Sequence, residues 1–312
     1  MRAVTIIDGA LEWRDHADPT PGTGELLVAV QSAGINGADL IQRAGFYPAP
    51  PGSPQDIPGL ELAGEVVGVG DNVHRFKVGD RVMAVVGGGG QAELAVVHER
   101  TAIPLPDGIE WPEAGGFPEV FTTAHDALFT QCGLAMGERV CVHGAAGGVG
   151  IAGVQLAVAA GASVVATVRN ANLHEAVAAF GAKVVRPEGF ETSGPFDVIL
   201  ELVGAPNIAT DVESLEIGGR IAVIGVGGGV MAELNLHVLM GKRARIHGST
   251  LRVRPLEQKA AAAHLVEQHV IPLLASGAVR VPLAATYPMS EATAAYEHFA
   301  AGGKLGKIVL VN

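Results

Sequence analysis

Hydrophobic and polar positions follow two different patterns along this chain. From Met1 to about Gly116, short β-branched or alternating runs are separated by glycine and proline turns. This pattern predicts a β-rich domain of many short strands, similar to a barrel or sandwich. The expected strands span residues 1–7, 25–32, 61–69, 81–86 and 91–97. A short helix is expected over 38–43, with Asn36 as a candidate N-cap.

Beyond Gly115, apolar strands alternate with segments of helical spacing, which first appears over 119–129. Strands are expected over 140–143, 163–168, 183–186, 196–202, 220–224 and 245–247, and helices over 151–160, 172–180 and 209–215. The alternation predicts a parallel sheet with helices on both faces. A proline-bounded segment, 187–195, is expected to be a loop.

The C-terminal part returns to a different pattern. It predicts an alanine-rich helix over 255–274, a second helix over 291–301 with Ser290 as its N-cap, and a final strand over 307–311. Nothing in this pattern alone makes these elements an extension of the parallel sheet.

A glycine-rich turn lies between an expected strand and an expected helix, within residues 138–162. The turn A-A-G-G-V-G follows the dinucleotide-binding pattern G-x-G-x-x-G. Ala145, Gly147 and Gly150 occupy the three glycine places, and the residues expected to bind the coenzyme are Ala145, Gly147, Gly148, Val149 and Gly150. Gly147 allows a pyrophosphate to approach the backbone, and the N–H groups at the helix start would hold the phosphates. An ordinary glycine turn is the alternative, but the strand–turn–helix–strand context favours nucleotide binding.

Composition narrows the classes of protein. The 312 residues are 48% hydrophobic and 17% charged, with a formal net charge of -11, which disfavours nucleic acid and anionic membranes as partners. The two cysteines, Cys132 and Cys141, exclude a disulfide framework and a four-thiolate zinc site. The first residues read as a strand and not a signal peptide, and no uncharged apolar run approaches membrane-spanning length. The expected location is the cytoplasm.

Segments spread over nearly the whole chain resemble one family. They are residues 34–52, 57–70, 77–82, 121–128, 143–150, 218–225, 248–252 and 306–310. In this order they resemble the zinc-independent quinone oxidoreductases of the medium-chain dehydrogenase/reductase superfamily. Within that family the chain looks most similar to the branch that includes the p53-inducible quinone reductase.

The resemblance implies a fold class and a domain organisation. It implies a mixed α/β protein in which a GroES-like catalytic domain, residues 1–116 and 268–312, surrounds an inserted Rossmann domain, residues 117–267. It further implies a cofactor in the cleft between the domains and a homodimer formed through the Rossmann sheet edge.

The zinc ligands of the superfamily's alcohol dehydrogenases have no counterpart here. Those enzymes use a cysteine and the histidine of a G-H-E sequence, whereas this chain reads Ala33-Gly34-Ile35-Asn36 and Gly59-Leu60-Glu61. Leu60 cannot ligate zinc, and without ligands there is no Lewis acid to polarise a carbonyl. The histidines show no ligand spacing, so no metal is expected.

The second strand of the expected nucleotide fold ends at Arg169, with no carboxylate available for a ribose 2′-hydroxyl. A guanidinium suits a 2′-phosphate, so NADPH is expected over NADH; a solvated surface arginine is the alternative. Relatives usually add a lysine and a tyrosine nearby, where this chain has Leu173 and Arg186-Pro187. Whether Arg186 also contacts the 2′-phosphate is left open.

By resemblance, Asn36 and Thr123 lie near the nicotinamide. The strand ends at Val203–Gly204 and Ile224–Gly225, the segment containing Ser249, and the tail residue Lys307 are expected to complete the coenzyme site. Each single residue has a plainer alternative: a helix cap for Asn36, an ordinary first-turn helical residue for Thr123, and a surface charge for Lys307.

Tyr47, in the sequence G-F-Y-P, is the expected hydrogen-bond donor to the substrate carbonyl, with a packing aromatic as the alternative. The expected activity is NADPH-dependent reduction of small quinones or α,β-unsaturated carbonyls by hydride transfer. An enoyl-thioester reductase is ranked lower because no basic cluster accompanies Tyr47, and a non-catalytic NADPH-binding protein is a third reading. The acceptor, proton donor, stereochemistry and oligomer size are not set by the sequence.

Overall fold

The computed structural model describes residues 1–312, which form two compact units. Unit 1 comprises Met1–Thr122 and Leu251–Asn312, and unit 2 comprises Thr123–Thr250. The domain boundaries expected from the resemblance, after residues 116 and 267, stay a prediction. No helix is both long enough and apolar enough to span a membrane.

Unit 1 is built on antiparallel β-structure. Its strands are β1 (Arg2–Ile7), β2 (Ala10–Asp15), β3 (Glu25–Gly34), β4 (Glu61–Val69), β5 (Arg81–Val85), β6 (Leu94–His98), β7 (Ala102–Pro104), β14 (Leu283–Pro288) and β15 (Lys307–Val311). The main sheet has the order β14-β15-β3-β4-β5-β7, β6 also pairs with β3, and β1 and β2 form a separate hairpin. The sequence pattern missed β2, β7 and β14.

The long strand β3 organises this unit because it pairs antiparallel with β4, β6 and β15. Its side chains alternate, so that Leu26, Val28 and Val30 enter the core while their neighbours are partly exposed. Gly64 on β4 has to be glycine, since a Cβ atom there would lie 2.2 Å from the carbonyl oxygen of Ala29.

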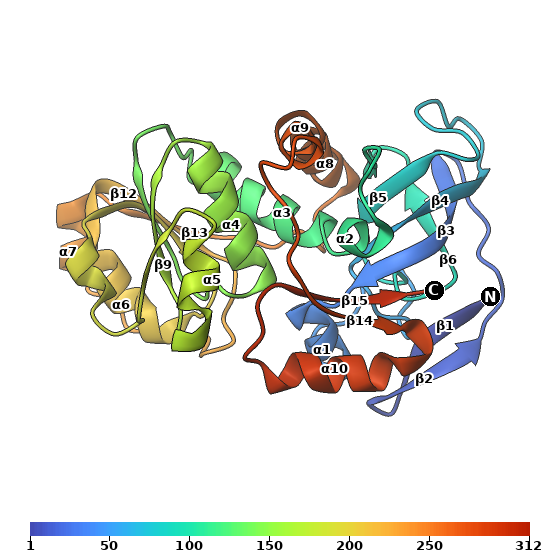
Figure 1. Ribbon diagram of the computed structural model, residues 1–312, viewed down its shortest axis with the longest axis horizontal. Coiled ribbons are helices and arrows are strands. Elements are labelled where there is room, and N and C mark those ends of the chain that lie inside the picture. The colour runs from blue at the N-terminus through green and yellow to red at the C-terminus, as the bar shows by residue number, and fades with distance from the viewer. The chain divides into compact units, whose positions relative to one another are not determined.

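The C-terminal strand β15 lies between β3 and β14, antiparallel to the first and parallel to the second. Figure 1 shows these last strands, in red, beside the blue N-terminal strands. The expected strand over 307–311 is therefore confirmed, and it extends the sheet of unit 1, not the parallel sheet of unit 2.

The helices of unit 1 correct two expectations. They are α1 (Gly37–Arg43), α2 (Trp111–Gly115), α8 (Leu256–His269), α9 (Ile271–Ala275) and α10 (Ala292–Ala301), while α3 (Pro118–His125) spans the boundary with unit 2. The expected single helix over 255–274 is divided, because Pro272 lacks an N–H and begins a new helix. Ser290 does not cap α10; it lies in a 3₁₀ turn, η4 (Met289–Glu291), and the cap is Glu291.

Unit 2 contains a six-stranded, all-parallel sheet. Its strands are β8 (Arg139–Val142), β9 (Ser163–Thr167), β10 (Lys183–Val185), β11 (Phe196–Glu201), β12 (Leu215–Val223) and β13 (Arg245–Gly248). Their spatial order is β10-β9-β8-β11-β12-β13. This is the 3-2-1-4-5-6 order of a Rossmann sheet, whose direction of winding reverses between β8 and β11.

Strand alternation places core side chains on both faces of this sheet. Cys141 and Ile199 pack in the hydrophobic cluster shared with Val212 of α6 (Ala205–Glu213) and, at its edge, with α7 (Leu236–Lys242). Val142 and Leu200 face Gly153 of α4 (Gly148–Ala159) on the other side. The predicted fold class, a β-rich GroES-like domain plus a Rossmann doubly wound parallel sheet, is confirmed.

Three local expectations in unit 2 were wrong in detail. The helix expected over 209–215 begins earlier, at Ala205, because Pro206 favours the first turn of a helix; the chain is already in β12 at Leu215. The segment 187–195 is not all loop, since Phe190–Ser193 forms a 3₁₀ turn, η3, that buries Phe190. The helical segment 119–129 divides into α3 and a π-helical segment, η1 (Asp126–Gln131).

Candidate functional site

The glycine turn after β8 has the geometry that phosphate binding requires. Gly144 adopts φ +61°, Gly147 is the N-cap of α4, and the helix has no acidic residue in its first turn. The first amides of a helix have no intrahelical partner and attract an anion. A Cβ atom at Gly150 would lie 2.6 Å from Cα of Ala145, so this position has to be glycine.

Gly147 tests directly whether a dinucleotide fits. A Cβ atom there would meet nothing nearer than 3.4 Å, the carbonyl oxygen of Gly144. The backbone at Gly147 is therefore open on the side where a side chain would stand. Gly148 and Val149, the first residues of α4, follow it and place their amides at the same helix end.

The turn after β11, Val203–Gly204, lies across the switch point from the glycine turn. Gly204 has φ +105°, and a Cβ atom there would lie 2.7 Å from the carbonyl oxygen of Gly229. Glu201 accepts hydrogen bonds from the amides of Val203 and Gly204, the latter at 2.7 Å. The buried carboxylate of Glu201 thus fixes the backbone of this turn.

The next strand, β12, ends at the same edge of the sheet. The amides of Ile224 and Gly225 donate to the carbonyl oxygen of Glu201, and a Cβ atom at Gly225 would lie 2.4 Å from the carbonyl oxygen of Leu202. Ser249 follows β13, where its hydroxyl donates to Asp126 at 3.2 Å. Unit 2 therefore gathers the expected Rossmann-side residues along the carboxyl edge of its sheet, where ligands of such sheets bind.

Arg169 and Arg186 follow two neighbouring strands. Strands β9 and β10 pair through Thr167 and Val185, and the amide of Val168 donates to the carbonyl oxygen of Val185 at 3.0 Å. Arg169 is exposed and has no ion-pair partner, while Arg186 makes only a 3.9 Å pair with the exposed Glu188. Two guanidinium groups thus extend from adjacent strand ends.

Lys307 is not a surface charge. It is 3% exposed, and its ammonium group contacts Glu61 Oε1 at 2.6 Å, Asn36 Oδ1 at 2.7 Å and the carbonyl oxygen of Ile35 at 3.0 Å. The amide of Asn36 also donates to Glu61 at 2.8 Å. All three ammonium hydrogens of Lys307 are therefore used inside unit 1.

Asn36 is the N-cap of α1, as predicted, but its side chain serves the Lys307–Glu61 pair. Its backbone amide donates to Asp39, which also accepts from the amide of Gly59. Burial raises the pKa of Asp39 to about 7. Two buried carboxyl groups and one ammonium thus surround Asn36.

Tyr47 lies on a half-buried loop that an arginine fixes. The guanidinium of Arg252 lies 4.9 Å from the ring centroid of Tyr47 and donates to the carbonyl oxygens of Tyr47 and Gly87 at 2.8 Å. Partial burial raises the pKa of Tyr47, so its hydroxyl stays protonated and can donate at neutral pH. The adjacent Phe46 is 83% exposed.

Thr123 lies inside α3 and is 6% exposed. Glu61, Asp39, Arg252 and Glu201 were not predicted as site residues. Two of them carried a signal in the sequence: Glu201 ends a buried apolar strand, and Asp39 stands three residues after an N-cap asparagine, as in a capping box. A buried charge at such a position needs a partner.

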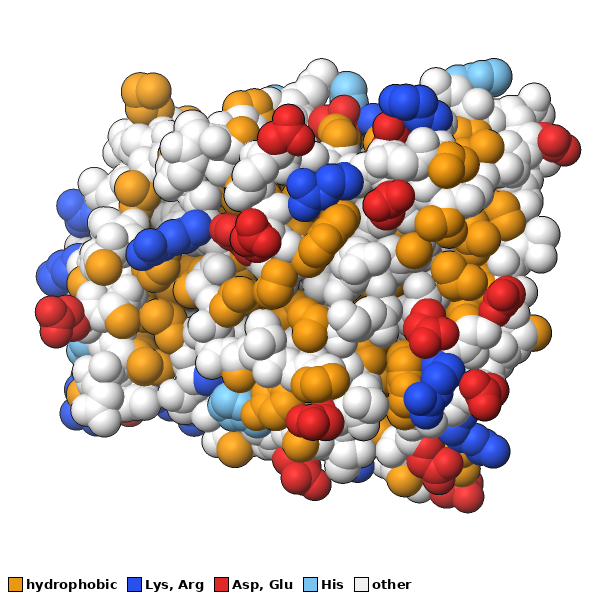
Figure 2. All heavy atoms as spheres, turned by 45° about the vertical axis from the view of Figure 1, so that its right-hand side comes forward, with side chains coloured by type: hydrophobic (Ala, Val, Ile, Leu, Met, Phe, Trp, Pro, Cys, Tyr) orange, Lys and Arg blue, Asp and Glu red, His pale blue; other side chains and the backbone are white.

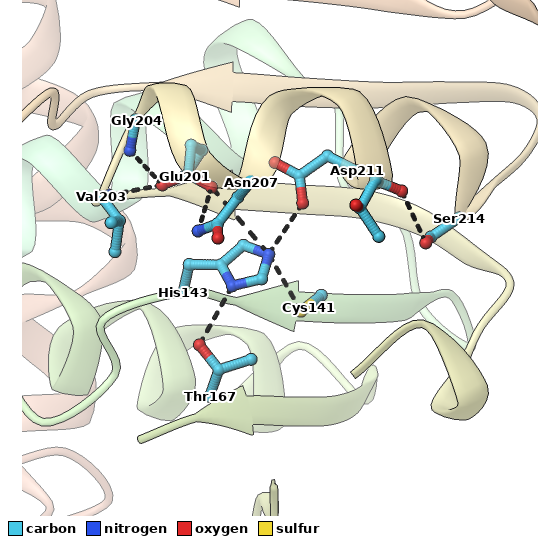
Figure 3. A network of polar contacts seen from close by, with 10 residues as sticks. Cys141, His143, Thr167, Glu201, Val203, Gly204, Asn207, Asp211 and Ser214 are labelled. Atoms are coloured by element: carbon cyan, nitrogen blue, oxygen red, sulfur yellow. Dashed lines mark hydrogen bonds and ion pairs between the residues drawn. The ribbon is translucent and has the colours of Figure 1, made fainter. Parts of the chain in front are cut away.

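Leu60, which stands where the zinc-using relatives have a histidine ligand, is a buried apolar residue with 4% exposure. The group of side chains that could hold a metal lies elsewhere, in unit 2, where His143, Glu201 and Asp211 offer ligand atoms within 4.8 Å of one another. Figure 3 shows these side chains pointing toward one another between β8, β11 and α6.

Two family models match this chain. Residues 22–107 match the alcohol dehydrogenase GroES-like domain, and residues 180–310 match the model described as zinc-binding dehydrogenase. The chain is 32% identical to the quinone oxidoreductase of Mus musculus over 331 aligned residues, which cover 100% of this chain and 98% of that protein.

Solved structures agree with this assignment. The quinone oxidoreductase of Pseudomonas syringae superposes with a TM-score of 0.87 at 26% identity, covering 100% and 99% of the two chains. A mycobacterial protein solved as a complex with NADPH superposes with a TM-score of 0.88 at 25% identity, covering 100% of both. The chain therefore belongs to the medium-chain dehydrogenase/reductase superfamily, as an oxidoreductase of the quinone oxidoreductase-like family.

Proposed function

We propose that this enzyme reduces small quinones or α,β-unsaturated carbonyls with NADPH and without zinc. The observation that carries the proposal is the carboxyl edge of the parallel sheet, where a glycine turn opens at the start of α4 and two arginines follow β9 and β10. The relatives named quinone oxidoreductase, and the related structure that contains NADPH, support it.

The amides at the start of α4 and the Val203–Gly204 turn would hold the pyrophosphate and the nicotinamide side of the coenzyme. Ile224, Gly225, Ser249 and Thr123 are proposed to line the remainder. Arg169 would pair with the 2′-phosphate, since it is exposed and carries no carboxylate partner. When bound, the reduced coenzyme supplies the hydride.

Tyr47 is proposed to donate a hydrogen bond to the carbonyl oxygen of the substrate, which gains negative charge during reduction. Arg252 would orient Tyr47 through its contacts with the ring and the backbone carbonyl. We propose that Asn36 acts near the nicotinamide. Because the ammonium hydrogens of Lys307 are all used, its proposed contribution is to orient Asn36.

The test is to mix the purified enzyme with NADPH and a panel of small ortho- and para-quinones and enones, and to follow NADPH oxidation. We expect turnover with the quinones and weaker oxidation of NADH. Turnover with crotonyl-CoA alone would make the enzyme an enoyl-thioester reductase. Binding of NADPH without turnover on any acceptor would make it a non-catalytic NADPH-binding protein.

Three finer assignments belong to the same proposal. The branch that includes the p53-inducible quinone reductase is supported by the sequence segments that resemble it. A homodimer is supported by β13, an edge strand of the parallel sheet, where Ile246 is 37% exposed and Met240 of the neighbouring α7 is 73% exposed. The cytoplasm is supported by Cys132 and Cys141, both free and buried.

A further inference from the structure

A buried polar network joins the ends of three neighbouring strands of unit 2. We define it by its side chains: Thr167, His143, Asp211, Glu201 and Asn207. His143 follows β8, Thr167 ends β9 and Glu201 ends β11, while Asn207 and Asp211 stand one turn apart on α6. The alternation of β8 and β11 brings His143 and Glu201 to the face that α6 covers.

His143 is the centre of this network. Its Nδ1 atom lies 3.0 Å from Thr167 Oγ1, and its Nε2 atom lies 2.9 Å from Asp211 Oδ1 and 4.0 Å from Glu201 Oε2. The ring of Phe190 closes the pocket with an edge contact at 4.5 Å. His143, Glu201 and Asp211 are all 0% exposed, so each polar contact is made away from water.

Glu201 connects the network to the backbone through hydrogen bonds. One carboxylate oxygen accepts from the amides of Val203 and Gly204, and the other accepts from Asn207 Nδ2 at 2.9 Å. On the opposite side, Thr167 accepts the amide of Ala145 through its carbonyl oxygen at 3.2 Å. The glycine turn, the turn after β9 and the turn after β11 thus lie around one polar cluster, in which His143 and Glu201 approach to 4.0 Å.

A metal ion does not fit this arrangement as it stands. Tetrahedral zinc bonds of 2.0–2.1 Å place neighbouring ligand atoms about 3.3 Å apart. Here His143 Nε2 and Asp211 Oδ1 already form a direct hydrogen bond at 2.9 Å, and the oxygens of Glu201 have amide donors. Cys141 Sγ, 3.7 Å from His143 Nε2, is the remaining titratable group that faces the histidine.

We infer that this buried network is the positioning machinery of the coenzyme site: Asn207 orients Glu201, Glu201 fixes the Val203–Gly204 turn, and His143 lies against Glu201 on the side of the glycine turn. The inference rests on the proposed function, because the fixed turns are those proposed to hold NADPH. Without the carboxylate, two amides would lose their acceptor and the turn would become mobile.

The test compares Glu201→Gln with Glu213→Gln, a matched change at an exposed residue that ends α6. In Glu201→Gln the new NH2 group must face either the two backbone amides or Asn207 Nδ2, all of which are donors. The dissociation constant and the KM for NADPH should therefore rise about tenfold or more, which corresponds to about 1.4 kcal/mol. At saturating NADPH, kcat should change far less than KM, because no reacting atom is touched. Glu213→Gln should match the wild type.

A milder variant guards against misfolding. Asn207→Ala removes one orienting donor, is made at a partly exposed residue, and should give an intermediate rise in KM for NADPH. Amide hydrogen exchange without coenzyme should be faster at Val203 and Gly204 in Glu201→Gln, with the rest of the sheet unchanged.

The outcomes separate the inference from the proposed function. Wild-type enzyme that binds no NADPH would overturn the proposed function and this inference together. Wild-type enzyme that binds NADPH, with unchanged KM and unchanged exchange in Glu201→Gln, would overturn the inference alone. A large rise in melting temperature of the wild type on adding one equivalent of zinc, absent in Glu201→Gln, would show that the cluster holds an ion, which also overturns it.

Discussion

Lys307 Nζ and Glu61 Oε1 lie 2.6 Å apart in the interior of unit 1, joining the start of β15 to the start of β4. Their side chains are 3% and 0% exposed. A pair this deeply buried costs a large desolvation energy, but removing one partner alone costs more, because the other charge is left without compensation. Gly34 makes room for the carboxylate, since a Cβ atom there would lie 2.2 Å from Glu61 Oε1.

We therefore expect Lys307→Met to lower the free energy of unfolding by about 3–5 kcal/mol, measured by urea denaturation. The double variant Lys307→Met with Glu61→Met should recover part of this loss, since no charge then remains buried. Lys77→Met is the control, because Lys77 pairs with Asp80 at the surface. Equal stability of Lys307→Met and the wild type would contradict the importance of the pair.

Replacement of Arg169 tests the coenzyme preference. In Arg169→Ala, NADPH should bind about tenfold or more weakly, because a charge-assisted contact with the 2′-phosphate is lost, while NADH binding should change little. Arg14→Ala, at an exposed position of unit 1, should leave both affinities unchanged. Equal affinity of the wild type for the two coenzymes would remove the basis for assigning Arg169 to the phosphate.

Asp211 gives stability an unusual dependence on pH. Burial raises its pKa from 3.8 to about 7, so the folded state holds a proton that the unfolded state has lost between these values. Unfolding then releases a proton, and stability falls as pH rises from about 4 to about 7, after which the loss is constant. Asp39 acts in the same direction, since its pKa is also raised to about 7.

Asp211→Asn keeps the shape of the side chain and removes the titration. The substitution breaks no hydrogen bond at the Oδ2 position, because Asp211 Oδ2 has no hydrogen-bond partner in the wild type. We expect the variant to gain stability relative to the wild type as pH rises, with little difference near pH 4. Melting temperatures recorded across this range measure the effect, and a constant offset between the two proteins would be evidence against it.

Tyr47→Phe removes the hydroxyl group proposed to stabilise charge on the substrate oxygen. Loss of one such donor lowers turnover by about 10²-fold in well-studied sites, so a fall in kcat of about that size is expected with an unchanged dissociation constant for NADPH. The matched control is Tyr287→Phe, whose hydroxyl bonds His298 at 2.9 Å within unit 1. An equal kcat in wild type and Tyr47→Phe would assign the donor elsewhere.

The edge strand β13 makes the oligomeric state testable. A charge at Ile246, in Ile246→Lys, should convert a dimer to a monomer because charged residues block pairing at a sheet edge. Light scattering during size-exclusion chromatography would report the mass. Val78→Lys is a control of similar chemistry at an exposed turn of unit 1. Wild-type protein that elutes as a monomer would contradict the proposed interface.

The exposed surface adds a constraint on partners. Figure 2 shows one face of the molecule, on which lysine and arginine side chains are interspersed with aspartate and glutamate. No extended basic patch covers this face, and the net charge is -11. The net negative charge of the whole chain disfavours polyanionic partners, in line with the proposed small-molecule substrates.

The parallel sheet could be predicted from the sequence because the patterns that indicate it are local. Each strand is a short apolar run, and the glycine turn at Gly147 follows one of them directly. The missed strands β2 and β14 lack such runs: Ala10–Asp15 carries a charge at three of its six positions, and Leu283–Pro288 is largely exposed. Their pairing is set by distant partners, which periodicity does not contain.

The features of the candidate site also differ in whether the sequence predicts them. Backbone features at Gly150 and Gly204 follow from sequence, because only glycine tolerates the close contacts there. The Glu61–Lys307 pair did not, since it joins residues 246 positions apart. Buried carboxylates and their partners come together only through the tertiary fold, which is why Lys307 could be read as a surface charge.

The position of β15 also affects the order in which the two units can fold during translation. Strand β3 receives one of its neighbours from the far end of the sequence, together with the cation that neutralises Glu61. Unit 2 draws every strand of its sheet from one continuous stretch. During translation unit 2 can therefore fold before the chain is complete. Unit 1 cannot, because the Glu61 carboxylate has no cation beside it until the final strand is synthesised.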